Sequence, residues 1–548
     1  MSLQSLQDSL LSKRANQEDE KGEGGKGTER IFKTLSSDGF KVSEKRWFII
    51  LVFCVLTMSN SMMWCTFSPI SDVTEDFFEK PLPGNNTAVN MFTVVFYVLY
   101  LPGTILGTLV TKKTNLRELI LFGGALTALG GLFRCIGVAA ITTIGSEWSY
   151  ALTLFGQILG AVANPFFMNI PASLASTWFA IDQRDLATAI TSMCNPFGDV
   201  IGQILPPLLV TKRNDVDDDS NAVVDGMLTL MIIEFGWALV GFVLCYFFFD
   251  ACPPTPPSAS TYLRQESKPI KDLDQRGYDE DDEKDNRNLN VHSNLEERNN
   301  TRCIVYDDED NIDIRERNEN YDLSLQTQIN QNSYNTSYNK LKSECNELFS
   351  SREYVLLFIA ISIGLGTFNS VLGLLNQIVQ EYGYSNWDAG WFGAVLVAAG
   401  MLFAGVAGYI MDKTHAYREC LRYCFLLATL SLTFFLTMIY HNNFGLLCFA
   451  SALLGIFSVG LTPFAIELCS EITYPISEDI SVGMLLVGSN YAGILITFVV
   501  QELLKESAFG PPPLLPSSIF MISMLGLSVL SVYSFKGEYK RLHADQNN

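Results

Sequence analysis

The chain has 548 residues, of which 48% are apolar and 17% are charged, and its formal net charge at pH 7 is −21. Once a polar internal segment is set aside, this apolar share is typical of a membrane protein and excludes a purely soluble domain. Many acidic residues gather between positions 251 and 350, where they mark a solvated loop, so the net charge indicates no nucleic-acid partner.

Apolar runs predict twelve transmembrane helices, since a helix needs about 20 mostly apolar residues to cross a bilayer. Residues 1–46 lack the apolar core of a signal peptide and are expected to be a disordered tail. Residues 251–352 are expected to be a disordered acidic loop between six-helix bundles at 47–250 and 353–536, with a tail at 537–548. The expected spans are 47–70, 88–110, 117–140, 150–172, 187–210, 227–249, 354–378, 389–411, 419–440, 444–468, 480–504 and 515–535.

Charge at the span ends predicts the orientation of the chain. Lys45 and Arg46 precede the first span, and an acidic run at 217–219 follows the fifth. We therefore expect both termini and the long loop in the cytosol, in either the plasma membrane or an endolysosomal membrane. The sequon at Asn85 then falls in the first outer loop and is expected to be glycosylated.

Three sequence features recur in the two halves, in order and at a nearly constant separation. The matched pairs are Gly107 with Gly408, Asn164-Pro165-Phe166 with Thr462-Pro463-Phe464, and Asn195 and Gly198 with Asn490 and Gly493. This recurrence predicts an all-α membrane protein whose twelve transmembrane helices form two pseudo-symmetric six-helix bundles. Such halves usually enclose one site at their interface, near the middle of the membrane.

Polar side chains inside spans are costly, so each must face protein or a water-filled cavity. Asn60 and Trp64 share one face of the first span, where they either line a site or serve as helix glue and an interfacial anchor. Asp199 and Glu234 are candidates for proton coupling, with pairing to a neighbour as the alternative for Glu234. Arg134 is expected to snorkel to the outer interface.

Residues 408–414 read GYIMDKT, the Gly-x-x-x-Asp-Lys pattern found after the second helix of a major facilitator half. We expect Gly408 to form the turn of a short loop, Asp412 to accept from a neighbouring helix N-terminus and Lys413 to stay in the cytosol. Glu471, near a Tyr-Pro pair, is expected to form part of a gate or a helix cap.

Longer runs resemble the feline leukaemia virus subgroup C receptor family of major facilitators. They are PASLASTWF (171–179), NPFGDVIGQILPPLLV (195–210), LLNQ (374–377), DAGWFGAVLVAAGM (388–401), DKTHAYR (412–418) and EITYPISE (471–478). SNSMMWCTFSPISDV (59–73) and CNPFG (194–198) look most like its less characterised, major-facilitator domain-containing branch. The resemblance implies a facilitator fold, alternating access and a substrate among those of the family, which include haem, choline and vitamin B6.

Choline-transporting members build their pocket from aromatic rings and amides, because a quaternary ammonium binds ring faces. By this resemblance Trp64 keeps an aromatic wall, and Asn369 replaces a tyrosine. Asn164 and Asn490 stand at glutamine positions of that pocket. We expect these residues to converge on a site, with Gln377 as a further contact or as interhelical glue.

The sequence therefore predicts a transporter of a small polar or cationic metabolite, choline-like or ethanolamine-like, by alternating access. Haem or vitamin B6 transport and a non-transporting ligand receptor remain alternatives. We expect no enzyme, because no HExxH or Ser/His constellation occurs. No metal or cofactor is expected either, since the 12 cysteines lie mostly in spans without CxxC spacing. The expected partners are the substrate and membrane lipid, and the expected assembly is a monomer.

Overall fold

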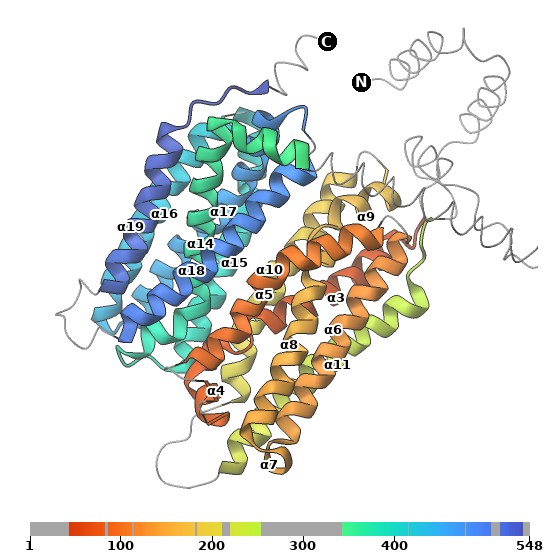
Figure 1. The fold of residues 1–548 in the computed structure, drawn as a ribbon, viewed down its shortest axis with the longest axis vertical. Coiled ribbons are helices and arrows are strands. Elements are labelled where there is room, and N and C mark those ends of the chain that lie inside the picture. The colour runs from red at the N-terminus through yellow and green to blue at the C-terminus, as the bar shows by residue number, and fades with distance from the viewer. Residues whose placement is uncertain are drawn as a thin grey trace, which may run out of the picture. The chain divides into compact units, whose positions relative to one another are not determined.

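The fold is helical throughout the part of the chain that the computed structural model describes (Figure 1). The described residues are 43–79, 81–82, 86–111, 114–180, 183–210, 220–253, 342–414, 416–476, 478–505 and 516–540. They contain twelve helices of 19 or more residues, which confirms the predicted twelve-helix architecture.

The first bundle holds six of the long helices and the second bundle holds the other six. The first set is α3 (Arg46–Cys65), α5 (Thr87–Thr111), α6 (Leu116–Ala139), α8 (Ser146–Met168), α10 (Arg184–Leu209) and α11 (Ser220–Phe248). The second set is α14 (Arg352–Gln380), α15 (Asn386–Thr414), α16 (Tyr417–Met438), α17 (Phe444–Thr473), α18 (Glu478–Lys505) and α19 (Pro516–Ser534). Short helices α4 (Ser71–Phe77), α7 (Ile141–Ile144) and α9 (Pro171–Trp178) and the 3-10 turns η1 (Ser68–Ile70) and η3 (Ile439–His441) complete the described elements that carry labels.

Eleven of the helical segments in these residues are long and apolar enough to cross a membrane. Helix α10 is not among them, although it has 26 residues. It carries three internal prolines, and Asn195, Asp199 and Gln203 interrupt its apolar residues. Such interruptions lower the hydropathy of a span without shortening its helix. Polar residues inside a span often belong to a functional site.

The contacts within the two bundles match helix by helix, as an internal repeat requires. In the first bundle α3 packs on α10, and α8 packs on both α5 and α6; in the second α14 packs on α18, and α17 packs on both α15 and α16. Pro165 lies inside α8 and Pro463 inside α17, at matching places. The bundles meet through α10 with α15 and through α5 with α18, which is again a symmetric pair of contacts.

Glycines set the closest approach of the matched helices α10 and α18 to their neighbours. A Cβ at Gly198 of α10 would lie 2.5 Å from the Met58 carbonyl oxygen of α3. A Cβ at Gly366 of α14 would lie 2.8 Å from the backbone nitrogen of Gly493 of α18. Small residues let helix backbones approach in a membrane, where packing must replace the hydrophobic effect.

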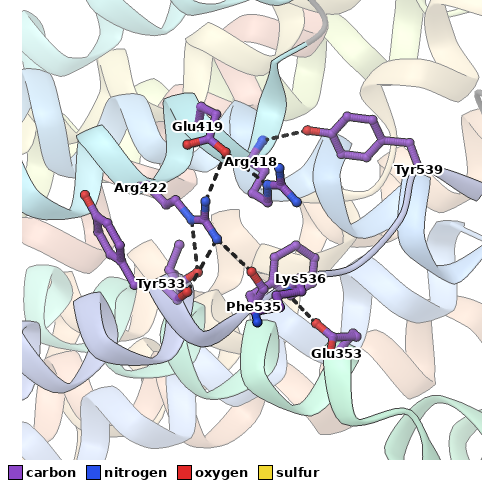
Figure 2. A network of polar contacts seen from close by, with 9 residues as sticks. Glu353, Arg418, Glu419, Arg422, Tyr533, Phe535, Lys536 and Tyr539 are labelled. Atoms are coloured by element: carbon purple, nitrogen blue, oxygen red, sulfur yellow. Dashed lines mark hydrogen bonds and ion pairs between the residues drawn. The ribbon is translucent and has the colours of Figure 1, made fainter.

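A polar network holds together the ends of α14, α16 and α19 in the second bundle (Figure 2). The Arg422 guanidinium donates to the Phe535 carbonyl at 2.8 Å and pairs with Glu419 at 3.0 Å. The backbone nitrogen of Lys536 donates to the Glu353 carboxylate at 2.7 Å. Because the last carbonyls of a helix have no partner within it, the fork of Arg422 serves as a cap for α19.

Helix α15 departs from the expectation for the GYIMDKT segment. It runs without a break to Thr414, so Gly408 lies inside the helix and makes no turn. The expected loop turn at Gly408 is therefore wrong, because the helix continues past the apolar run that was used to place its end.

Several expectations fall outside the described residues. These are the sequon at Asn85, the tail at 1–42, most of the acidic loop and the tail beyond residue 540. Within the expected loop, residues 342–350 form a helix, which belongs to a unit (264–350) separate from the two bundles.

Candidate substrate site between the bundles

Asn60 of α3 lies in the interior of the first bundle and joins three helices. Its side-chain nitrogen donates to the Gly160 carbonyl of α8 at 2.9 Å and to the Thr127 hydroxyl of α6 at 3.2 Å. Asn164 of α8 donates to the Asn60 oxygen at 3.1 Å. Asn60 is fully buried, whereas Asn164 is half-buried. These bonds match the helix-glue alternative for Asn60, and Asn164 lies at the edge of the interior.

Trp64 lies where α3 faces both α5 and α14. Its ring packs edge to face against Tyr97 of α5, with ring centroids 6.2 Å apart. The ring also packs against apolar clusters of both bundles. The Tyr97 hydroxyl donates to the backbone carbonyl of Asn369 on α14 at 3.3 Å. Trp64, Tyr97 and Asn369 thus form an aromatic corner that bridges the two bundles.

Asn369 lies at this corner, where its backbone carbonyl accepts from Tyr97, and the residue is half-buried. The side-chain amide has no hydrogen bond to any residue that the structure describes. The neighbouring Ser370 instead holds α14 on α18, by donating to the Gly493 carbonyl at 3.1 Å and accepting from Thr497 at 2.9 Å. Asn490 of α18 donates to the Leu486 carbonyl of its own helix at 2.9 Å and is also half-buried.

Gln377 lies further along α14 in a cluster of three amides that spans the bundles. It donates to the Asn90 oxygen of α5 at 2.7 Å, and Asn90 donates to the Gln501 oxygen of α18 at 2.8 Å. Gln501 in turn donates to Thr87 at 2.8 Å. The described geometry thus matches the glue alternative for Gln377, because its amide is used between helices.

More hydrogen bonds join the bundles at the same end. Ser68 of η1 donates to the carbonyls of Leu372 and Gly373, both at 2.9 Å. The Asp72 carboxylate of α4 accepts from Gln380 at 2.9 Å and from Asn386 at 2.7 Å. This end, where α3 finishes and α5 begins, is therefore closed, and we call these bonds and the amide cluster the polar seam.

The two intramembrane acids have different surroundings. Glu234 of α11 pairs with Arg134 of α6 at 2.8 Å and accepts from Thr66 at 2.6 Å. Asp199 of α10 accepts from the Ser61 hydroxyl and, at 3.7 Å, from the Cys65 thiol, both on α3. Asp199 is 8% exposed, and no basic side chain pairs with it among the described residues.

The expectation that Arg134 snorkels is wrong. Its side chain is 1% exposed, and its guanidinium lies over the Phe67 ring at 4.9 Å. A buried partner of opposite charge offsets the cost of removing the guanidinium from water, and the sequence position of Arg134 near a helix end did not reveal that Glu234 faces it.

The expected gating residues lie at the other end of the bundles. Gly408 is open, since a Cβ there would meet no atom within 4 Å, and Lys413 lies 6.0 Å from the ring of Tyr409. Asp412 lies on α15, but its side chain is outside the described set. Glu471 is buried near the end of α17.

Sequence reasoning missed Tyr97 of the aromatic corner and Asn90 of the polar seam. Both lie on α5, seven residues apart, and this spacing puts them on the same helix face. That spacing was the available signal. The described residues hold no cluster of His, Cys, Asp or Glu able to bind a metal ion.

Comparisons with known proteins identify relatives that span most of the chain. The chain is 27% identical over 523 residues to solute carrier family 49 member A3 of Xenopus tropicalis, covering 93% of this chain and 90% of that one. It is 26% identical over 506 residues to the choline/ethanolamine transporter FLVCR1 of Felis catus, covering 91% and 74%. The predicted resemblance to the subgroup C receptor family is therefore confirmed.

Solved structures support the same fold. A D-xylose–proton symporter matches with a TM-score of 0.62 at 14% identity, covering 90% of this chain and 98% of that one. A partially occluded, inward-open form of the E. coli xylose transporter XylE matches at 0.60 and 12% identity, covering 91% and 99%. The family model described as Major Facilitator Superfamily matches residues 49–497. With two matched bundles closed on each other at one end, the chain belongs to the Major Facilitator Superfamily and is a multi-pass membrane transporter.

Proposed function

We propose that the protein transports a small organic cation with a polar group, such as choline or ethanolamine, by alternating access. The aromatic corner carries this proposal. Trp64 and Tyr97 offer ring faces to a cation, which is worth about 2 kcal/mol per ring when the contact is desolvated. The Asn369 amide, unpaired among the described residues, offers a donor and an acceptor for a hydroxyl or amine at the same place.

The position of the corner also supports the proposal. It contains residues of both bundles, so a ligand bound there touches both halves and responds to their rocking. The names of similar proteins point to the same class, since FLVCR1 is a choline/ethanolamine transporter. If the N-terminus lies in the cytosol, as the charge pattern predicts, the polar seam closes the outer end of the transporter.

A large dianion such as haem fits less well. A dianion needs a basic side chain to pair with its charge. Arg134 is a buried basic residue, but it is already paired with Glu234. An anionic ligand at the corner would face the π clouds of two rings, which repel negative charge.

Uptake and counterflow of radiolabelled choline and ethanolamine into proteoliposomes test the function. We expect saturable uptake, with affinity for choline at least about ten-fold weaker in Trp64→Ala, because a desolvated cation–π contact of ~2 kcal/mol is lost. Trp64→Phe keeps a ring and should lose less. Absence of uptake for both solutes, or equal affinity in wild type and Trp64→Ala at matched expression, would contradict the proposal.

A further inference from the structure

We propose that Asp199 supplies the negative charge that selects a positively charged substrate at the aromatic corner. This inference rests on the proposed function and narrows its substrate class to ligands with a permanent or protonated ammonium group. It assigns to α10 a binding role that the corner residues of α3, α5 and α14 do not provide.

The packing of α10 on α3 places the carboxylate. Gly198 lets the two backbones approach, so the next residue, Asp199, reaches Ser61 and Cys65, which lie one turn apart on α3. Both contacts go to one carboxylate oxygen, Oδ1. A hydroxyl and a thiol orient a carboxylate but leave its charge uncompensated.

Comparison with Glu234 shows why this charge needs an occupant. Both acids lie inside the first bundle, yet Glu234 has Arg134 at 2.8 Å and Asp199 has no such partner in the described residues. An isolated ionised carboxylate in a span is expensive, so it stays ionised only where a cation pairs with it and otherwise takes up a proton. The positive group that Asp199 lacks within the protein is the one that a cationic substrate brings.

Asp199 lies on the side of α3 that faces the corner. Ser61, its hydrogen-bond partner, and Trp64 are three residues apart and share a helix face. Just beyond the end of α3, Ser68 of η1 donates across to the backbone of α14, so this end of α3 lies beside the second bundle. Cys65, the other hydrogen-bond partner of Asp199, belongs to the same apolar cluster as Val371 of α14, and Trp64 and Val200 pack against that cluster.

A second buried polar group on the same face of α10 also lacks a partner. The side-chain nitrogen of Asn195, one turn before Asp199, is buried and makes no hydrogen bond to the described residues. Asn195 and Asp199 are four residues apart and therefore adjacent along the helix. An orphaned donor beside an uncompensated acceptor suits a ligand that carries both a positive group and a hydroxyl.

The charged and titratable groups of the surrounding helices do not replace the substrate. Helix α3 contributes Cys65, α5 contributes Tyr97, and α11 contributes Glu234, whose charge Arg134 of α6 already offsets. The described basic residue of α15, Lys413, lies at its far end. None of these groups supplies a free positive charge beside Asp199.

Choline and its uncharged isostere 3,3-dimethylbutan-1-ol separate charge from shape. We would measure the inhibition constant of each against radiolabelled choline uptake in proteoliposomes. The wild type should bind choline at least about ten-fold more tightly than the isostere. Asp199→Asn, which keeps the shape and the oxygen acceptor, should lose about ten-fold for choline and less than about two-fold for the isostere.

Two controls keep the result interpretable. Asp199→Glu keeps the charge and should retain the preference for choline, and Asp225→Asn removes an exposed acid of α11 and should change neither constant. Thermal stability of each purified variant identifies misfolding. Should Asp199→Asn misfold, Asp199→Ser, which also removes the charge, takes its place in the comparison with Asp199→Glu.

The outcomes separate this inference from the proposed function. Equal losses for choline and isostere in Asp199→Asn, or no loss for either, would overturn the role of Asp199 while leaving choline transport intact. A change only in the pH dependence of uptake would also overturn it, in favour of a proton site. A wild type that binds neither choline nor ethanolamine would overturn the proposed function itself.

Discussion

At the scale of single residues, the ion pair of Arg134 and Glu234 is the most demanding feature of the first bundle. Both side chains are almost completely buried, and Thr66 and the Phe67 ring complete their surroundings. The mutual attraction of the two charges offsets part of the cost of removing both from water, whereas either one alone would be a buried, unpaired charge.

We therefore expect Arg134→Met to destabilise the protein strongly, by about 3–5 kcal/mol, because it leaves Glu234 without a partner. The double variant Arg134→Met/Glu234→Met removes both charges and should recover most of the loss. Thermal unfolding of the detergent-purified proteins measures both effects. A double variant less stable than the single one would contradict this reason, because it would show that an unpaired Glu234 is not what destabilises Arg134→Met.

The sequence showed which polar and aromatic residues lie inside the spans, but it did not show which neighbour each side chain faces. Trp64 and Asn60 were expected to share a face, and they do so on α3, yet Asn60 points into its own bundle while Trp64 reaches Tyr97. The prediction that Arg134 snorkels was wrong for the same reason. Depth in a span follows from counting residues, but the neighbour that a side chain meets depends on how helices rotate against one another.

At the scale of helices, the contact of α10 with α15 is made by glycine. A Cβ at Gly390 of α15 would lie 2.5 Å from the Gln203 carbonyl oxygen and 2.8 Å from Pro207, both on α10. This contact joins the two bundles, so a transporter that alternates between two states must form and break it.

Gly390→Ala should hinder closure of this contact without harming either bundle. Overpacking costs about 1–3 kcal/mol, which would shift the population of the closed state by roughly ten-fold. Distances between spin labels at the exposed Leu208 and Trp387 would report the shift as a longer separation. Gly405→Ala on the same helix is the matched control, because a Cβ there meets no atom within 4 Å. Identical distance distributions in the two variants would refute the role of Gly390.

Helix positions were the most predictable part of the fold. The twelve expected spans correspond to the twelve long helices, because hydropathy and length determine where a chain can cross a bilayer. The exceptions are instructive. Helix α15 continues to Thr414, beyond the apolar run, since a helix needs only satisfied backbone bonds to continue where its surroundings become polar.

At the scale of the whole molecule, the polar seam holds one end of the transporter closed. Its amides, one serine, one threonine and one carboxylate form hydrogen bonds worth about 1 kcal/mol each, so the closed state is favoured by a modest free energy. Such a modest bias suits a protein that must exchange two states many times per second or minute.

Asn90→Ala should open this end, because it removes the contacts of Asn90 with both Gln377 and Gln501. A cysteine at Thr93, which is buried beside Gly373, should then react several-fold faster with a membrane-impermeant thiol reagent, as read by mass spectrometry at that site. Thr433→Val, which removes a bond within α16 alone, is the control and should leave the rate unchanged. A rate equally slow in Asn90→Ala would show that the seam does not set the state.

The repeat in the sequence predicted the two bundles but not the bonds between them. Matching features such as Asn195 with Asn490 reveal equivalent helices, since each half folds by the same rules. The polar seam joins residues that have no counterpart in the repeat, such as Ser68 with the backbone of α14. A bond to a backbone carbonyl has no signature in the sequence of its acceptor.

Each bundle also returns to the level at which it started. Lys45, before α3, pairs with Asp250, after α11, at 3.5 Å, and Lys536, after α19, bonds to Glu353 at the start of α14. In each bundle, the start of the first long helix and the end of the last one therefore lie at the same side of the bilayer. We therefore expect that inserting a foreign domain between the two bundles would change neither the number of transmembrane helices nor the direction of any of them.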